Sequence, residues 1–460
     1  MARADSRLDA GRRFLTRFGL LCLWTALGVG LIGALFYTKA YSFLDILGVS
    51  FQTIRPLHLL AGTAWIYLGG LAVVTHFWSG GGERVASRAA GALRFFIWTW
   101  VLGALVVVAT LMLKVYGGRE YFFASEPASV LFWVGWSVLA IGFSRNRPDV
   151  PGPKPAYLWM WFTSFGLFTY AFVETHVFLL PYFKAHPLRD MAVEWKSYGT
   201  LVGSFNLLVY GSLAYLGHRL NPAAGYSRSR MAFALFIVGV LNSFTNYGHH
   251  TFHLPQSAIV KWTSFIVSMT EIAILAKVAY DVLGIARRLR DGKSWDGVTW
   301  LLAATTAWTF VGLTLSMVIS VPPLNALIHG TLVVAGHAMI SMVGIDTMGL
   351  LAVLGWIHVQ DRAGRAVISR WSVALFNLGA IIIWCSFMTV GISDALDRWH
   401  AGILPSRSHW PGWFPHAFLF GGLCVLAGVV RLTWSWFLPL PKAVAPDTTP
   451  APSESAAAPS

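Results

Sequence analysis

Apolar runs long enough to cross a lipid bilayer recur along this 460-residue chain. Hydrophobic residues make up 56% of the sequence and charged residues 12%, whereas soluble domains carry about 25% charged residues. A helix needs about 20 residues to cross the hydrocarbon core, and β-barrels show short alternating segments instead. We therefore predict an all-α integral membrane bundle of about twelve helices, at 14–37, 54–77, 93–114, 127–144, 157–181, 199–217, 231–250, 258–284, 299–320, 326–356, 371–392 and 414–438.

The net charge of +14 reflects basic loops that precede the first predicted helix and then follow every second one. The positive-inside rule places these loops and both termini in the cytoplasm, as in a multi-pass protein of the bacterial inner membrane. The charge therefore indicates membrane orientation among lipids and not nucleic-acid binding. We expect a cytoplasmic N-terminus (1–13), one membrane domain (14–438) and a disordered C-terminal tail (439–460) rich in Pro, Ala and Ser.

Five histidines fall in the outer third of the predicted bundle. His58 opens the second helix, His249 and His250 close the seventh, and His329 opens the tenth, with His337 about 12 Å deeper along it. Ionisable groups inside a bilayer are costly and usually functional, and imidazole is the commonest ligand of haem and transition metals. The pattern predicts a metal or haem site in the outer third of the membrane.

The adjacent pair restricts the geometry of such a site. Neighbouring residues of an α-helix point about 100° apart. His249 and His250 can therefore share one metal only if it lies beside the helix end or if the backbone distorts there. The alternative is a pair of interfacial histidines. For His337 the alternative is a packed core histidine, and for His58 it is an interfacial cluster with Arg55, one turn outward.

These motifs resemble the catalytic subunit of the haem-copper oxidase superfamily, most closely the nitric oxide reductases and then the cbb-type oxygen reductases. Arg55-Pro56-Leu57-His58 resembles the motif of the low-spin haem ligand, with Arg55 near the propionates. Gly248-His249-His250 resembles the pair that binds the non-haem metal, which is iron in the reductases and copper in the oxidases. His329-Gly330-Thr331 followed by His337 resembles the tenth helix, in which the deeper histidine is the proximal ligand of the high-spin haem. The shallower histidine would then contact a propionate or a loop.

Acidic residues extend the resemblance. Gly118-Arg119-Glu120 with Glu126 resembles an outer-loop motif of the reductases, whose glutamates lie near the haem propionates and a calcium ion. Glu120 is thereby a candidate calcium ligand, and a solvated loop acid is the alternative. Glu271 matches a glutamate of the eighth helix near the active site.

The tenth helix departs from the family pattern. His337-Ala338-Met339 stands where the family has His-x-His, whose second histidine is the other low-spin ligand. Met339 is a candidate thioether ligand, which would raise the haem potential, or a packing residue. In an alternative register His337 is the low-spin ligand and the high-spin haem lacks a proximal one. One or two b-type haems are therefore expected.

The sixth helix departs as well. Tyr198 stands where the family supplies a third histidine to the non-haem metal, so either a Tyr198 phenolate or His176 from the fifth helix is the candidate replacement. Val202 and Asn206 stand where the reductases have glutamates. Three other acids remain available for proton chemistry: Glu174, Glu194 and Glu271.

The resemblance implies reduction of two NO to N₂O and water at a high-spin haem that faces non-haem iron or copper. The chain has no Cys-x-x-Cys-His haem-attachment motif, so a cytochrome c-type partner subunit or quinol would supply electrons. Three alternatives stay open. They are a divergent haem-binding paralogue with altered or lost catalysis, an oxygen reductase, and a transporter without haem, since twelve helices suit that class too.

Overall fold

The computed structural model describes residues 2–38, 41–81, 83–117, 119–252, 254–277, 280, 296–362, 364, 366–402 and 410–439. Each of the twelve predicted segments contains a helix, and these residues include no strand, so the all-α prediction is confirmed. The long helices are α1 (Ala2–Leu35), α3 (Phe51–Ser79), α4 (Glu83–Met112), α5 (Glu126–Arg145), α6 (Ala156–Thr175), α8 (Pro187–Leu220), α9 (Arg230–Thr245), α10 (Ala258–Met269), α12 (Gly297–Ser320), α14 (Leu332–Met339), α15 (Met348–Asp361), α16 (Arg370–Ala401) and α17 (Phe414–Thr433).

Eleven helical segments of the described chain are long and apolar enough to cross a membrane. The 20-residue helix α6 lies among them as a further apolar helix. Because it has these apolar helices, the chain is a multi-pass membrane protein. Most of the predicted tail from residue 439, and the inner end of the predicted helix 258–284, lie outside the described residues.

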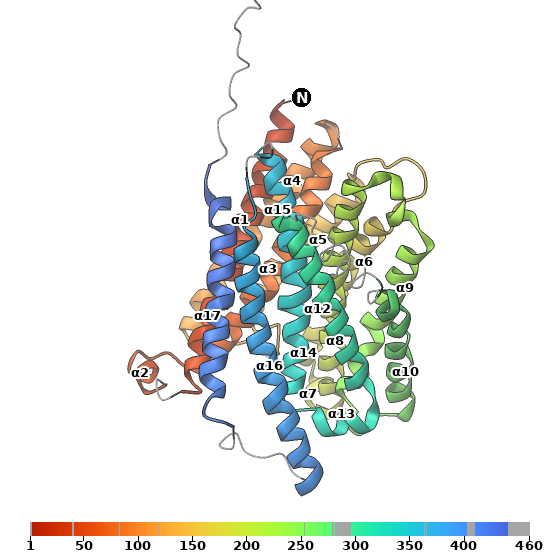
Figure 1. Cartoon of the computed structure of the whole chain (residues 1–460). Helices are drawn as coiled ribbons and strands as arrows, with labels where there is room; N and C mark the ends of the chain where they lie inside the picture. The colour runs from red at the N-terminus through yellow and green to blue at the C-terminus, as the bar shows by residue number, and fades with distance from the viewer. Residues whose placement is uncertain are drawn as a thin grey trace, which may run out of the picture.

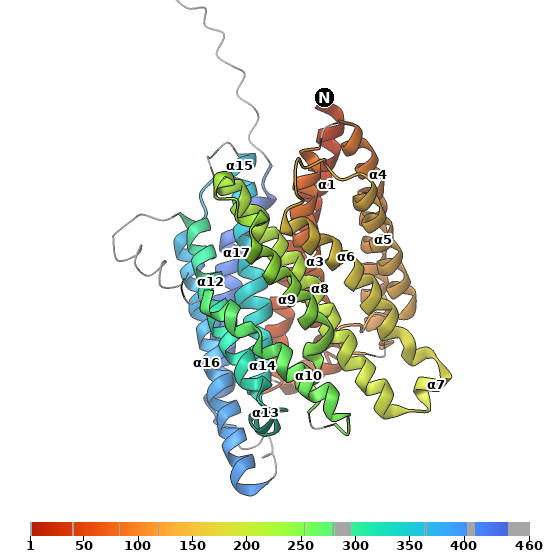
Figure 2. The same ribbon diagram turned by 90° about the vertical axis from the view of Figure 1, so that its right-hand side faces the viewer.

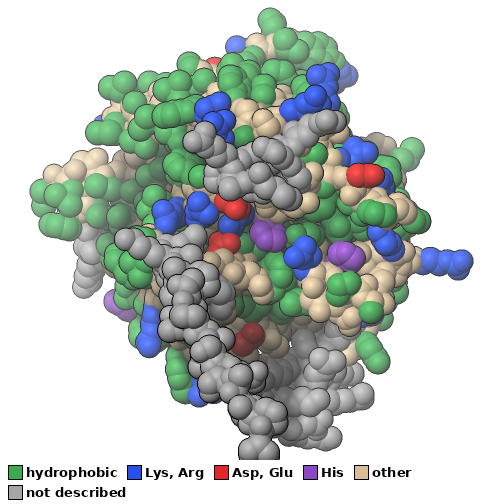
Figure 3. All heavy atoms as spheres, turned by 90° about the horizontal axis from the view of Figure 1, so that it is seen from above, with side chains coloured by type: hydrophobic (Ala, Val, Ile, Leu, Met, Phe, Trp, Pro, Cys, Tyr) green, Lys and Arg blue, Asp and Glu red, His purple; other side chains and the backbone are tan. Residues whose placement is uncertain are grey.

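The long helices run up and down between two ends of the molecule (Figures 1 and 2). One end holds the N-terminus and is called here the N-terminal face, and Lys and Arg side chains gather on it (Figure 3). The other end holds the short helix α13 (Pro322–Ile328) and is called the α13 face. Two other short helices are α2 (Tyr41–Ile46) and α7 (Pro181–Lys184).

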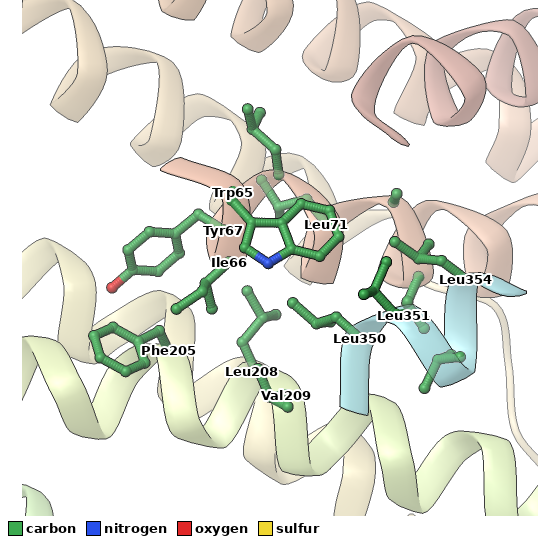
Figure 4. Packing of buried hydrophobic residues seen from close by; sticks show 14 of the residues in the cluster. Trp65, Ile66, Tyr67, Leu71, Phe205, Leu208, Val209, Leu350, Leu351 and Leu354 are labelled. Atoms are coloured by element: carbon green, nitrogen blue, oxygen red, sulfur yellow. The ribbon is translucent and has the colours of Figure 1, made fainter. Parts of the chain in front are cut away.

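Three segments form the interior. The most apolar windows of α3, α8 and the α14–α15 segment are 67%, 67% and 72% buried, against 17% for the window at Ala258–Lys277. Trp65 of α3, Leu208 of α8 and Leu350 of α15 meet there (Figure 4). Lipid is as apolar as leucine, so close packing holds such helices together. Gly70 permits it, because a Cβ at this position would lie 2.5 Å from Leu208.

The predicted helix 326–356 is interrupted, which corrects one expectation. α13 ends at Ile328, Gly330 has a left-handed φ of +83°, and the Thr331 side chain caps α14. His329 therefore lies in a turn and does not open the helix, because a glycine at positive φ ends helical geometry. A π-helical turn, Ile340–Thr347, then joins α14 to α15.

The predicted helix 157–181 is also shorter than expected. α6 ends at Thr175, and a 3₁₀ turn at His176–Leu179 leads into α7. Pro181 opens that short helix, where its missing N–H costs nothing. His176 therefore lies beyond the end of α6 on the α13 face.

Candidate functional site

The histidine pair closes α9 in a distorted turn. The backbone tightens into a 3₁₀ helix at Asn246–His250, and the Nε2 atoms of His249 and His250 lie 2.9 Å apart. The backbone thus departs from the α-helix where a shared ion requires it. Bonds of about 2 Å from both nitrogens to one metal ion are compatible with this spacing.

Glycines let the neighbouring helices approach the pair. A Cβ at Gly203 of α8 would lie 2.0 Å from the Ser243 hydroxyl of α9, and one at Gly248 would lie 2.5 Å from Ser264 of α10. Small residues at such crossings allow close backbone contact within membranes. Asn325 of α13 adds a hydrogen bond of 2.5 Å to the His249 carbonyl oxygen. The pair is therefore held from three sides.

Trp195 of α8 connects the pair to a third histidine. Its ring stacks on His250 at 5.4 Å and 10°, and meets His329 edge-on at 6.0 Å. The rings of His250 and His329 are 6.4 Å apart. In the part of the chain that the structure describes, no three His, Cys, Asp or Glu side chains are close enough to form a complete metal site. The pair therefore supplies two ligands, with His329 near by.

Tyr198 has partners other than the pair. Its hydroxyl donates to the Glu194 carboxylate, and its ring meets Tyr121 at 5.5 Å. Trp195 contacts both Tyr198, at 5.8 Å, and His250. His176 stacks on Phe172 at 4.6 Å, with its Nδ1 2.7 Å from the Phe172 carbonyl oxygen. The structure brings neither candidate third ligand to the pair.

His58 presents one nitrogen for a metal. Its Nδ1 lies 2.7 Å from the Ala26 carbonyl oxygen, which only accepts, so Nδ1 carries the proton. Nε2 then keeps its lone pair, and second-shell hydrogen bonds orient ligating histidines in this way. A Cβ at Gly30 of α1 would lie 2.9 Å from the ring, so α1 also fixes the ring position.

His337 and Met339 are the two haem candidates on α14. Nδ1 of His337 is buried and has no hydrogen-bond partner among the described residues. A Cβ at Gly62, one turn after His58, would lie 3.9 Å from the tip of Met342 in the π-helical turn, three residues after Met339. The helix of His58 thus contacts the turn that follows α14.

The chemistry of this donor set fits haem and a non-haem metal. The lone pair of His58 and the orphaned nitrogen of His337 suit axial coordination of iron. The paired imidazoles of His249 and His250 suit iron or copper.

Ion pairs link the loops of the α13 face. Arg55 pairs with Glu120, and Arg119, 3% exposed, pairs with Asp190. Burial, together with the negative charge of Glu120, raises the pKa of Tyr121 to about 12. Glu120 is thus engaged by a cation beside His58. Glu126 is exposed in the first turn of α5, and Gly118 lies outside the described residues.

The remaining acids have separate partners. Asn242 donates to Glu271 at 2.8 Å. Glu271 lies seven residues beyond Ser264, about 10 Å further toward the N-terminal face. Glu174 pairs with Lys196. A cavity of about 210 Å³ between α1, α3, α4 and α6 is lined by no histidine, and Leu57, next to His58 in the chain, borders it.

Sequence reasoning missed Trp195 and Asn325. Trp195 precedes Tyr198 by three residues, so helical periodicity offered a signal for it. Asn325 carries no comparable signal, because its role depends on where α13 folds back beneath η4, the 3₁₀ turn of the pair.

Comparisons with known proteins show the family to which this chain belongs. The family model described as cytochrome c and quinol oxidase polypeptide I matches residues 14–430. The chain therefore belongs to this family, the haem-copper oxidase subunit I proteins, and is a haem-containing membrane oxidoreductase subunit. The transporter alternative is left without support. No curated protein sequence gives a significant match.

A solved structure shares the fold. It is described as a cryo-EM structure of a heme-copper terminal oxidase dimer, and it superposes with a TM-score of 0.66 at 17% sequence identity. The match covers 96% of this chain and 85% of that one.

Proposed function

We propose that this protein reduces nitric oxide, with two NO, two electrons and two protons giving N₂O and water. The observation that carries the proposal is the 2.9 Å pairing of His249 and His250, with the ring of His329 6.4 Å from that of His250. Family membership supports haem and metal redox chemistry, and the arrangement of the phenols favours NO over O₂.

The phenols support this choice of substrate. The oxygen-reductase alternative needs a tyrosine paired with the metal histidines. Tyr198 donates to Glu194, and Trp195 is the ring that stacks on His250. Tyr247 packs through its Cβ against Gly199.

We assign each ligand a role. His58 and Met339 hold a low-spin haem b, with Arg55 near its propionates, and His337 holds a high-spin haem b. His249 and His250 hold non-haem iron or copper. When bound, the haems and the metal supply electron transfer and NO activation. The chain positions them, excludes lipid and conducts protons.

His329 and Glu120 complete the proposed site. His329 is either a third metal ligand or a propionate contact, since its ring lies 6.4 Å from that of His250. Glu120 joins a calcium site only if calcium displaces its ion pair with Arg55. We keep Tyr198 and Glu271 as residues that position the site or move protons.

We further propose that the protein lies in the bacterial inner membrane, with the Lys- and Arg-rich N-terminal face and both termini in the cytoplasm. The histidines then lie toward the outer surface. A cytochrome c-type subunit docking there, or quinol from the membrane, would deliver electrons.

A second candidate is a haem-binding paralogue with altered or lost catalysis. Tyr198 is engaged by Glu194, and Trp195 stacks on His250. Val202 and Asn206 supply no carboxylate near by. The metal would then have two histidine ligands, and the protein would bind it more weakly than a site with a third ligand does.

Reduced spectra with and without CO, haem and metal counts, and rates of NO and O₂ consumption with an electron donor test these proposals. Two haems, one of them binding CO, together with NO consumption support the reductase. Haem without turnover supports the paralogue, and rapid O₂ uptake supports the oxidase. His249→Ala should abolish turnover, whereas the exposed His186→Ala should leave it unchanged.

A further inference from the structure

A carboxyl group lies unpaired in the middle of the bundle. Asp346 is fully buried, near the centre of the segment Leu332–Asp361. Neither of its oxygens has a hydrogen-bond partner among the described residues. Charge on an unpaired buried carboxyl is costly, and intramembrane acids usually have a function. Asp346 is therefore expected to carry a proton at rest.

The segment around Asp346 packs against α8. Gly349, one turn further along, lies against Leu213 of α8, where its Cβ would lie 3.2 Å from that side chain. Tyr210 is one turn before Leu213, and it packs on the same buried cluster as Val240 of α9. Asn242, two residues further along α9, donates to Glu271. These three groups, Asp346, Tyr210 and Glu271, form the mid-membrane cluster.

A polar stripe connects this cluster to the histidine pair. The buried face of α10 and its continuation carries Ser264, Ser268 and Glu271, spaced so that all three share one side of a helix. The opposite side exposes apolar residues: Ile259, Trp262, Ile266 and Ile272. Ser264 lies against Gly248, next to His249. The stripe thus runs from the pair to Glu271.

The backbone around Asp346 is unusual and firmly held. Asp346 lies in the π-helical turn, and such turns are frequent at functional sites. Thr347 donates to the Met342 carbonyl oxygen at 2.7 Å and accepts from the Trp65 indole at 3.1 Å. These bonds tie the residue next to Asp346 to α3 and to the preceding turn.

We propose that Asp346 is a proton-donating residue for the histidine site. Its acid releases a proton through Tyr210 to Glu271 and the serine stripe, and becomes a carboxylate. A proton from the N-terminal face then restores the acid, while the electron donor supplies the electrons. This inference rests on the proposed function only in that the site consumes protons, which reduction of NO and of O₂ both do.

The test compares Asp346→Asn, which has the same shape but no acid, with Asp346→Glu, which keeps the acid. Asp394→Asn is the matched control, because Asp394 is a buried carboxyl on α16 that accepts from the Trp410 indole. Asp346→Asn should lower turnover by about 100-fold with haem content unchanged. Asp346→Glu should keep most of the turnover, and Asp394→Asn should turn over as fast as the wild type.

Infrared difference spectra between oxidised and reduced protein give a readout that does not require turnover. A band from a protonated carboxyl should vanish in Asp346→Asn, shift in Asp346→Glu and persist in Asp394→Asn. If the wild type consumes neither NO nor O₂, the proposed function fails, and these spectra alone decide the role of Asp346. Absence of the band from the wild type, or its persistence in Asp346→Asn, overturns the proposal. So does turnover of Asp346→Asn within about twofold of wild type. If Asp346→Asn loses haem, the shift of the carboxyl band in Asp346→Glu decides whether the band belongs to Asp346.

Discussion

At the residue scale, the proposed ligand set depends on one carbonyl group and on one close contact at a glycine. The Ala26 carbonyl oxygen selects the tautomer of His58 that leaves Nε2 free for iron. Gly62, one turn after His58, lies against the tip of Met342, three residues after Met339. Sequence reasoning named His58 and Met339 from their motifs, and their shared ligation of one haem stays a prediction.

Replacing Met339 tests the His/Met ligation directly. Methionine ligation raises a haem potential relative to bis-histidine ligation, so Met339→His should lower the midpoint potential of the low-spin haem. Met339→Leu should leave that haem five-coordinate and able to bind CO. Redox titration and CO difference spectra measure both effects, with Met342→Leu as the control. Unchanged spectra in Met339→Leu would assign Met339 to packing.

Gly248 tests the contact that holds the pair. Its added methyl group would lie 2.5 Å from Ser264, so Gly248→Ala should destabilise the protein by about 1–3 kcal/mol through overpacking. The content of non-haem metal should also fall. Gly217→Ala on α8 meets nothing within 4 Å and serves as the control. Thermal unfolding and metal analysis follow the two variants, and equal stability would contradict the close packing.

At the scale of elements, Arg398 of α16 caps the end of α13. It donates to the carbonyl oxygens of Ala326 (2.8 Å), Leu327 (3.1 Å) and His329 (2.8 Å). Hydrogen bonds from a charged group contribute about 1.5–3 kcal/mol each at most. Together they fix the turn that presents His329.

Arg398→Ala should lower the free energy of unfolding by about 2 kcal/mol and loosen His329. Arg370→Ala, an exposed arginine on the same helix beside Trp371, should change little. Thermal unfolding in detergent compares them. If His329 is a metal ligand, Arg398→Ala also lowers metal affinity, and unaltered affinity would favour the propionate contact.

The sequence predicted the helices better than the turns that interrupt them. Length and composition were sufficient for twelve helices, because a membrane admits little else. Gly330 could have revealed the turn at His329, since glycine often marks a positive φ. The π-helical turn has no such local mark. Asp346, an acid within an apolar run, was itself a signal, but the histidines drew the interpretation to the outer third of the membrane.

The distribution of charge predicts orientation for the whole molecule. Single cysteines at Ser144, on the N-terminal face, and at Ala401, on the α13 face, would report it. The background should lack Cys22, Cys385 and Cys424, all of which lie within helices. In intact cells a membrane-impermeant thiol reagent should label Ala401→Cys and spare Ser144→Cys. The reverse pattern would invert the proposed topology.

The π-helical turn also keeps the two halves of its segment in phase with their partners. One residue added to an α-helix rotates everything beyond it by about 100°, which would turn either His337 or Gly349 from its contacts. A π turn accommodates an additional residue locally. Both halves therefore keep their faces, and Asp346 lies within the turn that separates them.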